Sequence, residues 1–360
     1  MTKQNLNQRA ATRGVTLVEL LVVISILSVV AAVLIPRLRM INKDRNIREA
    51  SRMVASAFAK ASTRAVNDGI SGLVIVPNTN FREGSKGFQV PGVNDAVLYA
   101  GTRIYQMRRM PAYIGDDEFA VATAGGGAVI EIPRPFEHNQ SSSPPRLVVR
   151  RFDQISFNGS AYRYLITNVN LNGAKLELSL DSGSAPPPEM GDGVPFVIHR
   201  QPRRLESSRV ELPNGYMIDL RYSGPTLNSG TEETFGTRFN QNPSNGGTGE
   251  ITLYFDANGG VDRMFYYDSI ATNPGQVVTR RPISSLYWFV SYFDPDPNAI
   301  DPIASPSNKW VTVDHLTGSV NVASSAIPLG TDFNGSGTVT LADAIGEARE
   351  IADERRSAGQ

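Results

Sequence analysis

The chain has 360 residues, and its 35 Lys and Arg balance 35 Asp and Glu, so the formal net charge is zero. This balance gives no global electrostatic basis for binding nucleic acid, which needs a basic excess or patch. Cysteine is absent, which excludes disulfide frameworks, thiol catalysis and thiolate metal sites. Apolar residues make up 41% of the chain, enough to bury a sizeable core.

The first long feature is an apolar segment, residues 15–35, in which Glu19 is the single charged side chain. As a helix these residues would extend ~32 Å, about the thickness of the hydrocarbon core of a bilayer. The residues before it carry Lys3, Arg9 and Arg13 and no acid, a pattern typical of export signals. The sequence therefore predicts a transmembrane helix over residues 15–35.

Two ordinary interpretations of this segment leave Glu19 unexplained. A cleaved secretory signal would end at a small-x-small site, for which residues 29–31 or 30–32 would serve. A plain signal anchor needs no polar residue near its start. A carboxylate in a spanning segment costs ~2–3 kcal/mol on insertion scales and is a functional candidate by default. A charge tolerated at the membrane edge is the alternative explanation.

Residues 13–24, RGVTLVELLVVI, resemble the N-terminal motif of type IV prepilins and type II secretion pseudopilins. In that family a membrane aspartyl protease cuts after a glycine, the new N-terminus is methylated, and a glutamate is fifth in the mature chain. The resemblance implies cleavage after Gly14, removal of residues 1–14 as a leader, methylation of Val15, and a filament-assembly role for Glu19. Pro36 matches the family's helix-bending proline, whereas Val15 replaces the more usual phenylalanine or methionine.

The charges at this end suit such an assembly role. A protonated N-terminus at Val15 and an ionised Glu19 are each costly in lipid, and pairing between neighbouring subunits would relieve both and fix their axial register. Pro36 lacks an N–H, so we expect a kink in the helix there.

Counting Lys and Arg alone would place the far side of the span in the cytoplasm. The resemblance instead requires Gly14 to face a cytoplasmic protease, which implies a single-pass protein of the bacterial inner membrane with its head on the periplasmic or outer side, or a place in an extracellular filament.

Beyond Pro36 the apolar residues keep a three-and-four spacing, which predicts one helix over residues 15–67 whose second half packs on a domain. The stripe comprises Leu38, Ile41, Ile47, Ala50, Val54, Phe58, Ala61 and Ala65. Asn67, Asp68 and Gly69 follow, and Gly69 suits the left-handed position that ends a helix.

Residues 70–328 are predicted to form a β-rich head. Residues 70–76 are apolar β-formers, and turn dipeptides at 158–159, 172–173 and 317–318 and the turn at 257–260 join alternating runs, a pattern that favours hairpins. A long helix followed by such a head is similar to the H-type minor pseudopilin, whose head is a β-sandwich. The expected fold class is therefore α+β with a sandwich-like head. The head is longer than such a domain needs, so we expect an insertion at about residues 95–215.

Residues 332–343 have the spacing of a calcium loop. Oxygen donors fall at loop positions 1, 3, 5 and 12, glycine is at position 6 and a backbone carbonyl is available at position 7. The predicted ligands are Asp332, Asn334, Ser336, Thr338 and Asp343. With two carboxylates we expect weak Ca²⁺ binding, in the range of ~10⁻⁴–10⁻³ M. The loop resembles half of a dockerin repeat; a turn without metal is the alternative. Leu341, Ile345, Ala348 and Ala352 predict a following helix, so residues 329–360 form a loop-helix unit.

Nothing in the sequence predicts an enzyme. His138, His199 and His315 lack metal-binding spacing, and neither a G-x-S-x-G elbow nor a phosphate-binding glycine loop occurs. The expected function is a minor pseudopilin of a type II secretion-like filament. Its partners would be a prepilin peptidase and methylase, other pilin-like subunits and the inner membrane. The alternatives are a type IV pilus subunit and a membrane-anchored, calcium-dependent binding module with a dockerin-like tail.

Overall fold

The structure is a computed structural model of the chain. It describes residues 17–77, 100–122, 129–142, 146–180, 189–190, 192–225, 235, 250–268, 276–292, 303, 305–325 and 341–358. Within these ranges, the side chains of residues 33–41, 116–118, 267–268, 276–279, 341–344 and 355–358 lie outside the description.

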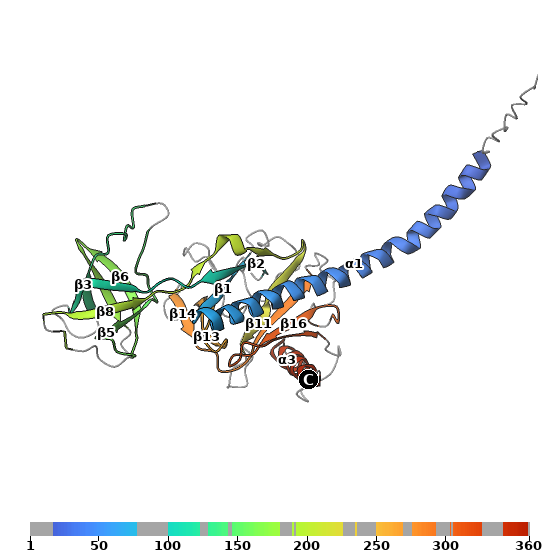
Figure 1. The fold of residues 1–360 in the computed structure, drawn as a ribbon. Coiled ribbons are helices and arrows are strands. Elements are labelled where there is room, and N and C mark those ends of the chain that lie inside the picture. The colour runs from blue at the N-terminus through green and yellow to red at the C-terminus, as the bar shows by residue number, and fades with distance from the viewer. Residues whose placement is uncertain are drawn as a thin grey trace, which may run out of the picture.

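One long helix, α1 (Leu17–Asp68), leads into the head. Its 52 residues correspond to a length of about 78 Å. The first half stands clear of the head and the second half lies against the sheet (Figure 1). The helix ends as predicted, because Gly69 adopts a φ of 83° and its N–H donates to the carbonyl oxygen of Ala65 at 2.7 Å.

The head is built on an 11-stranded sheet in which all of the pairings are antiparallel (Figure 1). Nine strands follow the order β14-β13-β12-β1-β2-β11-β15-β16-β17, and two short strands, β9 and β10, also pair with β2. Their bounds are β1 Ser71–Pro77, β2 Ala100–Arg108, β9 Arg203–Arg204, β10 Val210–Glu211, β11 Tyr216–Pro225, β12 Ile251–Phe255, β13 Val261–Asp268, β14 Gln276–Arg280, β15 Leu286–Tyr292, β16 Lys309–Val313 and β17 Val320–Ser324.

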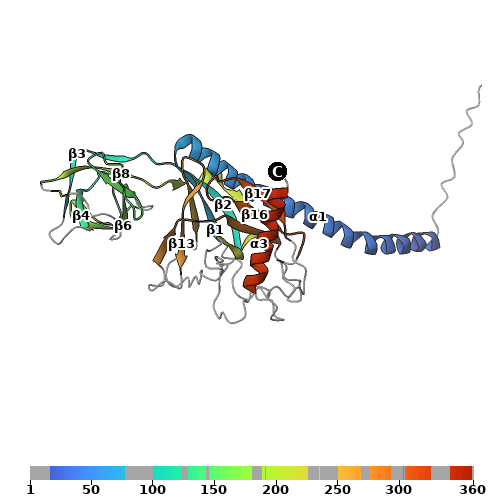
Figure 2. The same cartoon turned by 90° about the horizontal axis from the view of Figure 1, so that it is seen from below.

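Two helices cover opposite faces of this sheet (Figure 2). Strand β15 shows why: Trp288 and Val290 join the core formed with α1, whereas Tyr287 and Phe289 join the core formed with the C-terminal helix α3 (Leu341–Ala358). Alternate residues of a strand point to opposite faces, so a strand buried on both sides is apolar throughout. The predicted stripe of α1 is confirmed from Ile47 onward, where its members are buried: Ile47, Ala50, Val54, Phe58, Ala61 and Ala65.

A second, separate core lies at the far end of the molecule from the free end of α1 (Figure 1). Six strands close there into a barrel in the order β3-β4-β7-β6-β5-β8. They are β3 Tyr113–Ala122, β4 Val129–Pro133, β5 Gln154–Phe157, β6 Tyr164–Asn172, β7 Lys175–Leu180 and β8 Val194–His199. The barrel is inserted between β2 and β9, within the stretch in which the sequence predicts an insertion.

The sandwich-like arrangement expected for the head is wrong, although the α+β class and the β-rich head are confirmed. Among the described residues, helices rather than a second sheet cover both faces of the large sheet, and the strands of 113–199 close on themselves. The apolar stripe of α1 and the buried residues of α3 supply the surface that a second sheet would otherwise provide.

The hairpin predictions hold with small shifts. Strands β12 and β13, and β16 and β17, pair across the predicted turns. In the barrel, Asn172 pairs with Lys175, so the turn residues are Gly173 and Ala174 rather than Asn172 and Gly173. Strand β5 pairs with β6 only up to Ile155 and Tyr164, which makes the connection after Phe157 longer than a two-residue turn.

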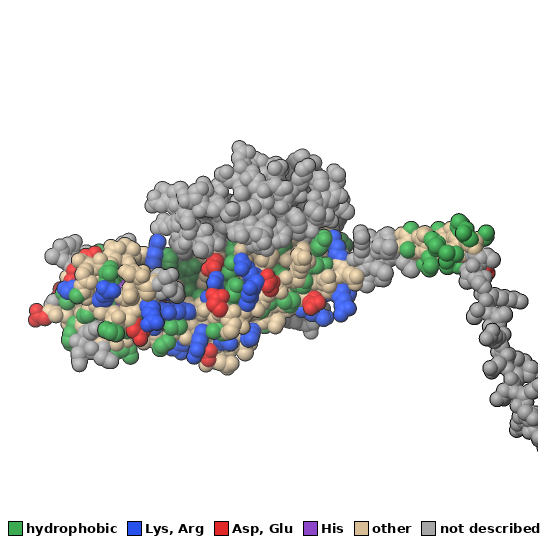
Figure 3. Space-filling model, turned by 90° about the horizontal axis from the view of Figure 1, so that it is seen from above, with side chains coloured by type: hydrophobic (Ala, Val, Ile, Leu, Met, Phe, Trp, Pro, Cys, Tyr) green, Lys and Arg blue, Asp and Glu red, His purple; other side chains and the backbone are tan. Residues whose placement is uncertain are grey.

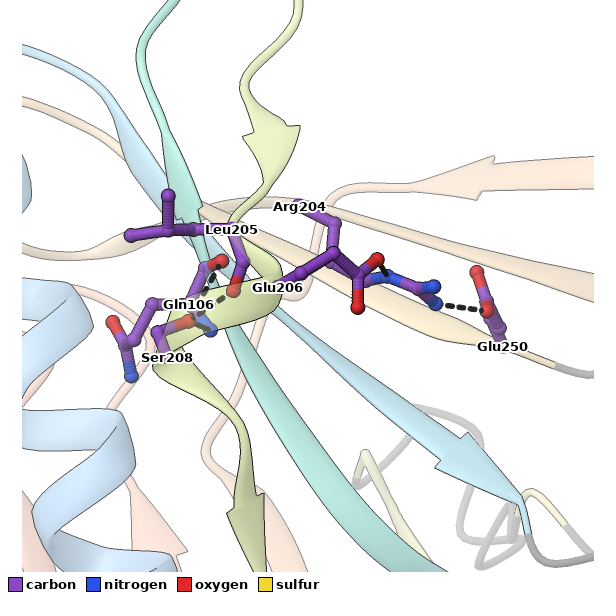
Figure 4. Close-up of polar contacts among 6 residues, drawn as sticks. All are labelled: Gln106, Arg204, Leu205, Glu206, Ser208 and Glu250. Carbon is purple, nitrogen blue, oxygen red and sulfur yellow. Dashed lines mark hydrogen bonds and ion pairs between the residues drawn. The ribbon is translucent and has the colours of Figure 1, made fainter. Parts of the chain in front are cut away.

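The return from the barrel is fastened to β2 by polar contacts (Figure 4). The backbone N–H of Gln106 donates to Ser208 Oγ at 2.8 Å, and the N–H of Leu205 donates to the carbonyl oxygen of Gln106 at 2.8 Å. Ser208 belongs to the 3-10 helix η1 (Glu206–Ser208). Arg204 donates to Glu206 at 2.6 Å and to Glu250 at 2.7 Å. These contacts hold the end of the barrel segment against the sheet.

Candidate assembly site on the N-terminal helix

The first part of α1 is apolar on every side and uncovered. The large apolar side chains from Leu17 to Val30 are between 45% and 79% exposed, and they occur at consecutive positions that cover the whole circumference of the helix. Figure 3 shows this hydrophobic stretch standing apart from the head. A helix that is apolar all round is normally buried, so this segment requires a covering that the described residues of this chain do not supply.

The polar side chains of this segment are few. The hydroxyl groups of Ser25 and Ser28 donate to the carbonyl oxygens of Leu21 and Ile24, each at 2.8 Å. Such bonds to the residue four positions earlier satisfy the hydroxyl within the helix itself. The serines therefore add no unsatisfied donor to an apolar environment, where such a donor would be costly.

Glu19 lies in the first turn of α1 with an exposed side chain. A carboxylate at the N-terminal end of a helix is favoured by the partial positive charge of the free N–H groups there. Its neighbours along the helix are exposed apolar residues, Leu17, Val18, Leu20 and Leu21. Glu19 is thus the one acidic group among the described side chains of residues 17–32.

Several predicted site residues fall outside the description. Gly14 and Val15 precede the first described residue, and Asp332, Asn334, Ser336 and Thr338 lie in the segment 326–340. The backbone of α1 is helical through Pro36, but the side chain of Pro36 is outside the description. Figure 1 shows that α1 curves along its length; a kink at Pro36 stays a prediction. The side chain of Asp343 is also outside, although its backbone lies in α3.

The helix that follows the predicted calcium loop is docked firmly. The buried positions Ile345, Ala348 and Ala352 confirm the predicted apolar face. Arg349, 2% exposed, donates from Nη2 to the carbonyl oxygen of Tyr222 at 2.9 Å. Its guanidinium also lies over the Tyr287 ring, 5.1 Å from the centroid. The apolar spacing predicted this helix, but nothing in the sequence indicated that Arg349 would be buried in its contact surface.

The sequence reasoning also missed a group of arginines where the barrel meets the sheet. Four of the five Arg-Arg pairs in the sequence, at 108–109, 150–151, 203–204 and 280–281, fall at or near the end of a strand. Because the formal net charge of the chain is zero, the overall charge gives no sign that arginines cluster at this place. The recurrence of the Arg-Arg dipeptide was the available clue in the sequence.

The predicted membrane span, residues 15–35, begins and ends beyond the described side chains, which cover residues 17–32 in this region. In the part of the chain that the structure describes, no helix combines the length and the apolar character needed to cross a membrane.

Comparison with known proteins gives one family match. Residues 9–35 match the model of the prokaryotic N-terminal methylation motif. No curated protein matches the chain. The motif implies processing by a prepilin peptidase and assembly with other pilin subunits, and it suggests a membrane-anchored protein. The matched residues include Glu19 and overlap the uncovered apolar half of α1, so the motif and the geometry both support a type IV pilin-like or pseudopilin subunit.

Proposed function

We propose that this chain is a minor pseudopilin of a type II secretion-like filament, cleaved after Gly14 and methylated at Val15. It acts as a structural subunit and not as an enzyme. The apolar half of α1 anchors the precursor in the inner membrane and then packs among the same helices of other subunits. The head stays on the periplasmic or outer side.

The observation that carries this proposal is the position of the uncovered apolar segment. The methylation motif covers residues 9–35, and the side chains from Leu17 to Val30 are exposed on all sides of the helix. The second half of the same helix is buried in the head from Ile47 onward. One continuous helix therefore presents one half to a bilayer or to other subunits and the other half to its own domain.

The bulk of the head supports a low-copy position rather than the repeating shaft. Two cores are present, the helix-covered sheet and the barrel, and the barrel lies at the end far from the free half of α1 (Figure 1). In a repeating shaft, a head extended in this way would have to fit against the heads of neighbouring subunits on both sides. At the tip of a filament the head has free space on one side.

The test is the mass of the protein recovered from bacterial membranes. We expect loss of residues 1–14 and a gain of one methyl group when a prepilin peptidase is present. The same chain should keep its leader in cells without that peptidase, and Gly14→Ala should keep its leader even in cells that have the peptidase. An intact Met1 in peptidase-positive cells, or a start at Val33 as a secretory peptidase would leave, would contradict the proposal.

We also propose that residues 332–343 bind Ca²⁺. The donor set of carboxylate, amide, hydroxyl and carbonyl oxygens suits a hard cation. Helix α3 begins at Leu341, inside the predicted loop and just before Asp343. Binding of the ion and formation of the first turn of α3 would therefore favour each other. Asp332, Asn334, Ser336, Thr338 and Asp343 would hold the ion, which would neutralise the two carboxylates and fix the approach to α3.

A further inference from the structure

A pocket of about 570 Å³ opens between the barrel and the sheet. Three parts of the chain line it. Gly69 and Arg109 come from the end of α1 and the exit of β2, Arg163 and His199 come from the barrel, and Asp262 and Arg263 come from β13. A ligand in this pocket would touch both folded units at once.

The pocket has a positive lining. Its charged side chains are five arginines, Arg109, Arg163, Arg200, Arg263 and Arg281, against two aspartates, Asp256 and Asp262. The face of the molecule in Figure 3 likewise carries Lys and Arg side chains along the junction between the barrel and the sheet. Concave sites lined by one sign of charge concentrate counter-ions of the opposite sign.

Internal partners already engage some of these arginines. Asp262 forms ion pairs with Arg281 at 2.6 Å and Arg263 at 3.1 Å. Arg109 donates from Nη1 to the carbonyl oxygen of Asp68 at 2.6 Å. Within the described residues, neither Arg163 nor Arg200 has a carboxylate within ion-pair distance, and the Nε–H of Arg200 is buried without a hydrogen-bond partner. A buried donor without a partner costs free energy that a bound acceptor would recover.

The neighbours of His199 show how closely the positive charges gather. Burial lowers the pKa of His199, and the charges of Arg163 and Arg109 lower it further. His199 Nε2 lies 3.0 Å from Ser156 Oγ; of these two residues, His199 lines the pocket and offers it a polar ring. Guanidinium groups bind carboxylate and phosphate oxygens in a two-pronged geometry that lysine does not provide.

We infer that this pocket binds a small soluble oligoanion bearing phosphate or carboxylate groups, held chiefly by Arg163 and Arg200. A lipid headgroup carries the same chemistry, but the position of the pocket argues against it. The pocket includes Gly69, directly after the end of α1. About 50 Å of helix separates that residue from the apolar half of α1, so the pocket lies far from a bilayer that holds the N-terminal half.

The ligand would also hold the barrel against the sheet. The described apolar contact at this junction is small and centres on Phe152, whose ring lies 5.5 Å from that of Phe265 between centroids. Phe152 adopts a φ of 72°, a conformation that a bulky residue adopts only when its surroundings impose it. An anion held by Arg163 and Arg200 in this pocket would lie beside Arg263 of the sheet, which lines the same pocket, and would reinforce this contact.

The experiment is calorimetry on the full chain in a neutral detergent at low salt, with inorganic pyrophosphate and citrate as separate probes. We expect one site for at least one probe, and an affinity that falls as salt is added because the charges are screened. The double variant Arg163→Gln, Arg200→Gln should bind at least tenfold more weakly. Arg209→Gln is the matched control, because Arg209 is an exposed arginine paired with Glu211 that does not line the pocket.

A second variant keeps the test valid if the double variant folds poorly. Ala161 is an exposed residue that lines the pocket, so Ala161→Glu places a carboxylate there and should abolish anion binding while the arginines remain. Binding of neither probe at millimolar concentration, or unchanged affinity in these variants, would overturn the proposal. Competition by phosphatidylglycerol added to the micelles would show a headgroup in the pocket and overturn the soluble ligand.

Discussion

The hydroxyl group of Ser62 in α1 donates a hydrogen bond of 2.9 Å to the carbonyl oxygen of Gly259, which lies 197 residues further along the chain. Gly259 belongs to the turn between β12 and β13, and this turn touches the turn between β16 and β17, where the carbonyl oxygen of His315 accepts from the N–H of Val261 at 2.8 Å. Ser62 therefore marks the point at which α1 and two hairpins from opposite parts of the sheet meet.

Gly318 makes this meeting point sensitive to a single methyl group. A Cβ at Gly318 would lie 1.9 Å from the carbonyl oxygen of Gly259, and the residue adopts a φ of 65°. We expect Gly318→Ala to lower the free energy of unfolding of the head by at least ~3 kcal/mol, because the turn must move as well as accept a strained φ. Denaturant unfolding measured by tryptophan fluorescence would report it.

Gly173→Ala is the matched control for that substitution. Gly173 has a similar φ of 60°, but a Cβ there would meet nothing within 4 Å. Its cost should be limited to the backbone term of ~1 kcal/mol. If Gly318→Ala lowers the unfolding free energy no more than Gly173→Ala does, the turn that contains Gly318 is not in close contact with the turn that contains Gly259.

Local patterns in the sequence predict the elements of this region but not their assembly. The three-and-four spacing predicted which face of α1 is buried, and the turn residues predicted the hairpins, because both depend on neighbours a few positions away. The contact between Ser62 and Gly259 and the closure of the barrel depend on pairings between distant segments, which no local pattern encodes. The same reason explains why the arginines around the pocket were missed: Arg163 and Arg263 line one pocket only because the barrel docks on the sheet.

Arg349 provides the second prediction. Its guanidinium is buried between α3 and the sheet and donates to the carbonyl oxygens of Tyr222, at 2.9 Å, and Pro225, at 3.3 Å. Arg349→Met keeps the length of the side chain but removes both donors and the charge over the Tyr287 ring. We expect a loss of about 2–3 kcal/mol and faster proteolytic removal of the C-terminal segment. Glu350→Gln, at an exposed position of the same helix, should leave both measurements unchanged.

Asp153 gives a pH-dependent prediction. It accepts from the N–H of Arg150 at 2.7 Å and from the N–H of Gln201 at 2.9 Å, at the connection between the barrel and the sheet. Burial raises its pKa to about 6, against the lowering effect of those hydrogen bonds and of Arg200. The folded state therefore binds the proton more tightly than the unfolded state, so this group contributes stability below pH ~4 that is lost as the pH rises through about 6.

The size of this contribution is on the order of 3 kcal/mol. As the pH rises from 4 to 7, we expect the unfolding free energy of the wild type to fall relative to that of Asp153→Asn. Glu211→Gln, at an exposed ion pair with Arg209, serves as the control for general charge effects. A difference between wild type and Asp153→Asn that does not change with pH would show that Asp153 is ionised throughout.

Glu19 carries the assembly prediction. Glu19→Ala should be inserted and cleaved normally, because the substitution makes the segment more apolar, yet it should fail to enter filaments, because the charge that sets the register with the neighbouring N-terminus is absent. Its abundance in sheared filaments, relative to its abundance in membranes, measures this. Glu19→Gln should fail in the same way, whereas Val23→Ala, at another exposed position of the helix, should assemble. Normal assembly of Glu19→Ala would leave this residue as a charge tolerated at the membrane edge.

The last prediction concerns calcium and helix α3. Without the ion, Asp332 and Asp343 repel each other across a glycine-containing loop that leads directly into α3, so the start of the helix should fray. With the ion, both charges are neutralised and the apolar face from Ile345 to Ala352 can stay on the sheet.

Binding of calcium to the folded form alone stabilises that form by about 1.4 kcal/mol at ten times Kd. The full chain in neutral detergent should therefore melt at a higher temperature in millimolar calcium, and magnesium should do less because it demands tighter octahedral geometry. The double variant Asp332→Ala, Asp343→Ala should lose that gain, so its melting temperature should be the same with and without calcium. Arg349→Met should still bind calcium in calorimetry, since it changes the docking of α3 and not the loop. A wild-type chain that takes up no calcium at millimolar concentration would reduce residues 332–343 to a turn.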